Sequence, residues 1–220
     1  MNLRKRLKKW GGEIVHRLRR VKPPADRAVD APEFHALGPG DIAIDCGANL
    51  GLIARIMGAN GAEVHAFEPN PDAFAVLQKN TRHLPGVHCH QQAVLDAPGQ
   101  MTLYLHLNYA RDPMRFASGS SLIADKRNVD DRRGVEVEVI DLVAFIAALD
   151  RPVKLMKVDI EGAEYALLNA MIDRGVMDRV ERIFVETHAH AAPSLREADT
   201  KLRARVAELG LGDKIDLNWI

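Results

Sequence analysis

The sequence predicts an α/β fold, a doubly wound and mostly parallel sheet in a single domain, from three observations. Apolar runs of strand length alternate with amphipathic helical segments along the chain. A glycine-rich turn joins the first run to the helix that follows it. Four of the runs end on acidic residues, Asp45, Glu68, Asp159 and Glu186. Because parallel strands end at one edge of a sheet, where such folds bind ligands, we expect these side chains to converge.

The predicted elements follow in order from residue 41. The stretch 153–160 is strongly apolar, whereas 99–107 and 134–142 alternate between apolar and polar residues, which is typical of strands with one exposed face. The polar stretch between Asn108 and Gly134 is expected to be mainly loop. In chain order, the predicted strands cover residues 42–45, 62–69, 86–94, 99–107, 134–142, 153–160 and 180–188, and the predicted helices begin at residue 52 and cover 71–81, 141–149, 163–173 and 195–209.

Composition places the chain among ordinary globular proteins. Its 220 residues are 47% hydrophobic and 27% charged, enough for one domain with a substantial core. Thirty basic residues balance thirty acidic ones, so the total charge does not call for a nucleic-acid partner. Two cysteines make no disulfide framework, and neither a signal peptide nor an apolar run of membrane-spanning length is visible. These features predict a cytoplasmic protein.

The first twenty residues carry eight Lys or Arg and one acid, Glu13. Read as a helix, they place apolar side chains on one face and basic ones around the rest, which suits peripheral contact with an anionic membrane or partner. A solvated helix face or a frayed tail is the simpler interpretation. The sequence therefore predicts a basic N-terminal extension, residues 1–30, with helical character, followed by the domain, residues 31–220.

The glycine turn after the first strand reads Gly47-Ala48-Asn49, and Leu52 stands where a dinucleotide fingerprint needs its third glycine. The Gly-Lys-Ser/Thr of a phosphate-binding loop is also missing. An acidic residue at the end of the second strand, Glu68, can accept both hydroxyls of a ribose. A ligand with a ribose, an amino-acid end and no phosphate fits this arrangement. S-adenosylmethionine is such a ligand, and Asp45 is expected near its charged methionine end.

Four motifs together resemble one known family. The stretches DCGANLG, FEPNPDAF, VKLMKVDIEGAEYALL and IFVETH occur in an order and spacing similar to the FkbM family of S-adenosylmethionine-dependent methyltransferases, over about residues 41 to 190. The resemblance implies a Rossmann-like class I methyltransferase fold and, usually, O-methylation of a hydroxyl on a sugar or other small metabolite. It implies cofactor contacts by Asp45, Gly47, Asn49, Gly51 and Glu68, with Ala93 and Asp96 beside the adenine.

The segment KVDIEGAE concentrates ionisable residues at a strand end and the start of a helix. We expect Asp159, His188 or Glu186 to take the proton of an acceptor hydroxyl, while Lys157 and Glu161 position the acceptor. For Glu161, stabilisation of the positive helix N-terminus remains an alternative. Binding of Mg²⁺ or Mn²⁺ by the three proton-accepting candidates competes with their catalytic use, but no diagnostic ligand spacing favours a metal.

The acceptor is expected to be a small molecule or glycan rather than a nucleic acid. No Asn/Asp-Pro-Pro-aromatic motif follows the strand that ends at Asp159, and only 5% of residues are aromatic. The polar loop 116–122 is the segment expected to hold the acceptor. After the last helix only residues 210–220 remain, fewer than the terminal hairpin common in this fold needs, so we expect that a homo-oligomer covers that edge or that the sheet ends short. A catalytically silent S-adenosylmethionine-binding partner protein and a nicotinamide enzyme are the rival functions.

Overall fold

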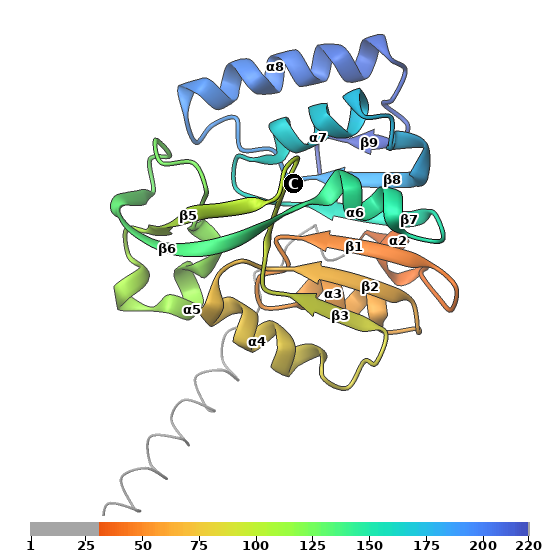
Figure 1. Cartoon of the computed structure of the whole chain (residues 1–220), viewed down its shortest axis with the longest axis horizontal. Coiled ribbons are helices and arrows are strands. Elements are labelled where there is room, and N and C mark those ends of the chain that lie inside the picture. The colour runs from red at the N-terminus through yellow and green to blue at the C-terminus, as the bar shows by residue number, and fades with distance from the viewer. Residues whose placement is uncertain (1–30, 220) are drawn as a thin grey trace, which may run out of the picture. The chain divides into compact units, whose positions relative to one another are not determined.

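Six parallel strands form the main sheet of the computed structural model, which describes residues 31–219 (Figure 1). In sheet order they are β3 (Val87–His90), β2 (Glu63–Phe67), β1 (Ile42–Cys46), β7 (Val153–Val158), β8 (Val180–Val185) and β9 (Ile215–Asp216). The direction in which the chain adds strands reverses between β1 and β7. A crevice opens at such a reversal, beyond the carboxyl ends of the strands, and the predicted doubly wound fold is confirmed.

Helices pack on both faces of this sheet. One apolar cluster joins one face to α2 (Pro32–His35), α3 (Leu52–Gly58) and α4 (Pro71–Thr81), and a second joins the other face to α6 (Leu142–Ala148), α7 (Glu164–Asp173) and α8 (Pro193–Glu208). Within β1, Ala43 belongs to the first cluster, while Ile42 and Ile44 belong to the second. Burial on both faces explains why the central strands read as continuous apolar runs.

A second, three-stranded sheet is a feature that the sequence did not predict. It consists of β4 (Ala93–Leu95), β6 (Val129–Asp141) and β5 (Gly99–His106), and Figure 1 shows β5 and β6 on the side toward which the arrowheads of β1 and β2 point. The predicted strand 86–94 is therefore two strands, separated at Gln91 and Gln92, which pair in different sheets. This break brings β4 over the carboxyl edge of the main sheet.

The stretch between Asn108 and Gly134 contains more regular structure than the expected loop. It forms η2 (Tyr109–Arg111), α5 (Pro113–Phe116), η3 (Ala117–Gly119) and the start of β6. Residues 130–134 of that strand are half-buried or exposed, and they lie where the antiparallel register with β5 shifts, between the pairs Tyr104–Gly134 and His106–Val129. A strand with little buried surface shows no apolar alternation, so the sequence pattern does not reveal it.

Up to residue 219, no antiparallel hairpin follows α8. The short β9 pairs parallel with β8 at the edge of the main sheet, and Trp219 packs against Phe34 of α2 with 5.8 Å between ring centroids. Within residues 31–219, no helix is long and apolar enough to cross a membrane. The expectations for residues 1–30, including membrane contact, lie outside the described residues.

Candidate functional site

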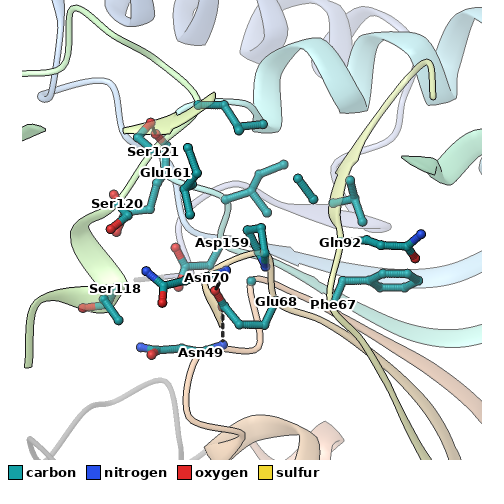
Figure 2. Close-up of a pocket in the computed structure, with 18 residues that line it drawn as sticks. Asn49, Phe67, Glu68, Asn70, Gln92, Ser118, Ser120, Ser121, Asp159 and Glu161 are labelled. Atoms are coloured by element: carbon teal, nitrogen blue, oxygen red, sulfur yellow. Dashed lines mark hydrogen bonds between the residues drawn. The ribbon is translucent and has the colours of Figure 1, made fainter. Parts of the chain in front are cut away.

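A cavity of about 590 Å³, counting its part open to solvent, lies at the carboxyl edge of the main sheet (Figure 2). The ends of β1, β2 and β7 form its floor, and β4, β5 and the segment before Leu122 complete its walls. Its lining comprises Gly47, Asn49, Phe67, Glu68, Pro69, Asn70, Gln92, Ala93, Val94, Leu103, Ala117, Ser118, Ser120, Ser121, Leu122, Asp159, Ile160 and Glu161. The sequence motifs that follow three parallel strands therefore meet in one concave space.

The glycine turn is shaped by close backbone packing. Gly47 has a φ of +75°, and a Cβ atom built on it would lie 1.8 Å from the carbonyl oxygen of Asp159. No side chain fits there, because that distance is far below van der Waals contact and L-residues avoid this conformation. Gly47 thus brings the ends of β1 and β7 together at the crevice.

Lys157, which was expected to position the acceptor, lies beneath this turn and outside the cavity lining. The side chain is buried, and its Nζ donates hydrogen bonds to the carbonyl oxygens of Gly47, at 2.7 Å, and Cys46, at 3.3 Å. Asp45, fully buried, lies 3.3 Å from the same nitrogen. Because neither Lys157 nor Asp45 lines the cavity, the pair stabilises the turn from below.

Glu68 ties the glycine turn to the start of α4. Its Oε2 accepts a hydrogen bond from the backbone N–H of Asn49 and its Oε1 one from that of Asn70, both at 2.8 Å, and Figure 2 shows the first of these bonds. Burial raises the pKa of Glu68 to about 7, although the two N–H groups oppose the rise. Each carboxylate oxygen keeps acceptor capacity for a ligand hydroxyl.

Three polar atoms around the cavity have no hydrogen-bond partner among residues 31–219. They are Oδ1 of Asn49, Nδ2 of Asn70 and Oγ of Ser120, and all three are buried. Asn70 uses its other amide atom to cap α4, where Oδ1 accepts from the backbone of Asp72 and Ala73. Buried polar atoms are almost always paired, so these three are available to bond a polar ligand or water in the cavity.

The remaining cofactor candidates separate into two groups. Ala93 lines the cavity at the start of β4, as does its neighbour Gln92. Gly51 does not line it, and its missing side chain has a packing reason, since a Cβ atom there would lie 2.7 Å from Leu77 of α4. Asp96 is exposed beyond the end of β4 and also lies outside the cavity lining. Of the two residues expected beside the adenine, Ala93 lines the cavity and Asp96 does not.

An acid–imidazole cluster stands beside the cavity, after β7 and β8. Nε2 of His188 is 3.3 Å from Oε2 of Glu161 and 3.8 Å from Oδ1 of Asp159. On its other side, Nδ1 of His188 lies 3.1 Å from Oε1 of the buried Glu164, which also accepts the His188 backbone N–H at 2.9 Å. Glu186 is half-buried nearby, and burial, then the charge of Asp159, raises its pKa. Asp159 and Glu161 face the cavity, whereas His188 lies behind them.

Glu161 is held in an unusual backbone conformation. Its φ is +58°, which non-glycine residues rarely adopt and which clusters at functional sites. Ser121 donates its hydroxyl to the carbonyl oxygen of Glu161 at 2.6 Å, and Lys126 Nζ forms a close ion pair with Glu161 Oε2. Burial lowers the pKa of Lys126 to about 8, although the negative charges of nearby carboxylates act to raise it. Two residues of the β5–β6 connection thus fix this glutamate.

The cavity lining includes Ser118 and Ser120, from the loop expected to hold the acceptor, and also Phe67 and Gln92, which were assigned no role from the sequence. Figure 2 shows Ser118 and Ser120 on one side of the cavity and Phe67 and Gln92 on the opposite side. Phe67 is the last residue of its strand and immediately precedes Glu68. This position at a strand end is a sequence signal that could have identified Phe67 as a cavity-lining residue. Gln92 offered no such signal, because its position depends on the break between the two sheets.

Comparison with known proteins identifies the family. The model of the Methyltransferase FkbM domain matches residues 45–210. This chain belongs to the FkbM methyltransferase family. The matched region contains every strand-end motif of the cavity described above, so the family assignment and the site concern the same residues.

Three relatives of this FkbM-family protein, found by sequence similarity, are named as methyltransferases. Methyltransferase 1 of Beauveria bassiana is 29% identical over 73% of this chain and 69% of its own length. The 31-O-demethyl-FK506 methyltransferase FkbM of Streptomyces tacrolimicus is 29% identical over 69% of this chain and 67% of its own. The hexuronic acid methyltransferase AglP of Haloferax volcanii is 27% identical over 70% and 58%. A Streptococcus mutans protein crystallised with SAH covers 81% of this chain and 82% of its own, at 11% identity and a TM-score of 0.46.

Proposed function

We propose that this FkbM-family protein transfers a methyl group from S-adenosylmethionine to a hydroxyl of a saccharide or secondary metabolite. One observation carries the proposal: the Glu68-clamped glycine turn and the acid–imidazole cluster open into the same cavity. The first suits a ribose-bearing ligand without phosphate, and the second suits removal of a hydroxyl proton. S-adenosylmethionine supplies the electrophilic methyl group.

The residues around the turn provide a place for this cofactor. Glu68 accepts the ribose hydroxyls, and the unpaired amide oxygen of Asn49 lies in the turn beside it. Gly47 keeps the turn open, and Ala93 with Phe67 forms the apolar wall for the adenine. Asp45 contributes from beneath through Lys157, which holds the carbonyl of Gly47.

On the acceptor side, Asp159 accepts the hydroxyl proton, because its carboxylate lines the cavity while the imidazole of His188 lies behind it. His188, fixed by Glu164 through both its backbone and ring nitrogens, orients Glu161 and Asp159. Alignment of the acceptor oxygen supplies about 7–11 kcal/mol of the barrier reduction, and a positioned base about 10²–10⁴-fold in rate. The protein therefore acts mainly by alignment.

Substituting Asp159→Asn or His188→Ala is expected to lower turnover at least tenfold and to leave cofactor binding within about twofold of wild type. The first change removes the proton acceptor, and the second releases Glu161. Turnover is measured as S-adenosylhomocysteine release, with Asp131→Asn, on an exposed strand position, as the matched control. Unchanged turnover in both variants would exclude this division of roles.

The proposed function is tested first by calorimetry with S-adenosylmethionine, S-adenosylhomocysteine and NAD. We expect micromolar binding of the first two and none of NAD, since the turn lacks a dinucleotide fingerprint. Acceptors are then screened by S-adenosylhomocysteine release, beginning with hexuronic acids and 31-O-demethyl-FK506, which appear in the names of two relatives. Binding of NAD alone would overturn the cofactor assignment. Cofactor binding without release on any acceptor would favour a silent binding protein.

A further inference from the structure

Lys126 is a lysine whose position the proposed reaction does not explain. It belongs to the connection between β5 and β6, yet only 5% of the residue is exposed. Its amine reaches Glu161, 35 residues away in the chain, and contacts Oε2 of that carboxylate. A buried lysine requires a strong compensating partner, because removing an ammonium group from water is costly.

The connection that carries Lys126 is anchored on both sides of the cluster. Ser121 donates to the backbone of Glu161, and the backbone N–H of Arg127 donates to the carbonyl oxygen of Ala191, beyond His188. A hydroxyl of Ser194, at the start of α8, lies 3.4 Å from a carboxylate oxygen of Asp125. The fold therefore delivers the amine of Lys126 to a defined place rather than leaving it on a free surface loop.

That place is also where a divalent cation would bind. Asp159, Glu161 and His188 each offer one ligand atom, and these atoms lie within 4.8 Å of one another. Two carboxylate oxygens and an imidazole nitrogen suit Mg²⁺ or Mn²⁺. Oε2 of Glu161, the oxygen that Lys126 contacts, is also the one 3.3 Å from Nε2 of His188. An ammonium group and a metal ion would compete for it.

The charge around this oxygen demands a cation. Four carboxylates gather here, from Asp159, Glu161, Glu164 and Glu186, and three of them, on Glu164, Asp159 and Glu186, act electrostatically on Lys126. Lys157 is 3.5 Å from Asp159, but its amine is already bonded beneath the glycine turn. The ammonium group of Lys126 therefore points at the Glu161 oxygen that His188 also approaches.

We infer that Lys126 is a built-in cation, which takes the position that a divalent metal would otherwise hold between Asp159, Glu161 and His188. Its ammonium group offsets part of the negative charge of the cluster and holds Glu161, so Lys126 is a positioning residue. The inference rests on the proposed function for its purpose, but the cation site itself is independent of methyl transfer. The protein is consequently expected to work without a divalent metal.

The test is Mn²⁺ binding, followed by the loss of the free-ion electron paramagnetic resonance signal, in the whole chain. Wild type and Lys126→Arg are expected to show no site tighter than millimolar, because both keep a cation at Glu161. Lys126→Ala vacates the position, and its Mn²⁺ affinity is expected to rise at least tenfold. The double variant Lys126→Ala/Glu161→Gln is expected to lose this gain, since it removes a ligand.

Two results would overturn the inference. One is a micromolar Mn²⁺ site in wild type that Glu161→Gln removes, which would make the cluster a metal site that displaces the lysine. The other is equal Mn²⁺ affinity in wild type and in Lys126→Ala. Should the alanine variant fail to fold, the wild-type measurement and Lys126→Ser decide in its place. S-adenosylmethionine calorimetry on the same samples separates these outcomes from failure of the proposed function, because the cofactor contacts lie at Glu68 and Asn49.

Discussion

Replacing Gly47 with alanine is expected to destabilise the protein by about 3 kcal/mol or more and to abolish cofactor binding. A Cβ atom there would lie 1.8 Å from the carbonyl oxygen of Asp159, so the end of β1 would have to move away from β7. The left-handed backbone, with φ of +75°, adds about 1–2 kcal/mol for any L-residue, and forced repacking adds about 1–3 kcal/mol. Urea unfolding measures the stability, and calorimetry measures the binding of S-adenosylmethionine.

Gly175 offers the matched control for this substitution. Its φ of +71° is close to that of Gly47, but a Cβ atom there would meet nothing within 4 Å. Gly175→Ala is therefore expected to lower the free energy of unfolding only by the cost of the left-handed backbone conformation, about 1–2 kcal/mol, and to leave cofactor binding unchanged. Equal losses in the two variants would show that the contact with Asp159 is not what requires glycine in the turn.

Replacing Glu68 with alanine is expected to weaken S-adenosylmethionine binding about 100-fold. The carboxylate holds the backbone of Asn49 and Asn70, and under the proposed function it also accepts the ribose hydroxyls. Each hydrogen bond to a charged group contributes about 1.5–3 kcal/mol, and 1.4 kcal/mol is a factor of ten in affinity. Asp96→Ala is the control, because this second acidic candidate is exposed outside the cavity. A larger loss in Asp96→Ala than in Glu68→Ala would reverse the assignment.

The same carboxylate predicts how cofactor affinity depends on pH. Burial raises the pKa of Glu68 to about 7, so the group takes up a proton as pH falls through neutrality. Binding of the ribose hydroxyls favours the ionised form, and affinity is therefore expected to be full above pH 8 and to fall by up to tenfold per unit below pH 7. Calorimetry between pH 5.5 and 8.5 measures this slope. Glu68→Ala should remove it, and a slope that persists in the variant would assign the titration to another group.

Much of the cofactor half of the site is visible in the sequence because it depends on neighbours along the chain. The strand, the turn at Gly47 and the helix from Leu52 follow one another directly, and Glu68 directly follows β2. Their side-chain period and turn residues identify these elements without knowledge of distant contacts. Parallel pairing then brings the strand ends together, as the observed sheet order shows.

The other half of the site depends on contacts between residues far apart in the chain. Lys157 and Gly47 are separated by 110 residues, Lys126 and Glu161 by 35, and Ser121 and Glu161 by 40. Local periodicity carries no information about such pairs, so the sequence predicted that Lys157 would position the acceptor and did not reveal its place beneath the glycine turn. The pairing of β6 with β4 and β5 likewise depends on long-range hydrogen bonds. Local residue patterns thus predicted the fold and the glycine turn. The tertiary structure alone paired the buried Lys157 with Asp45 and the buried Lys126 with Glu161, because a buried charge is stable only where folding brings an opposite charge to it.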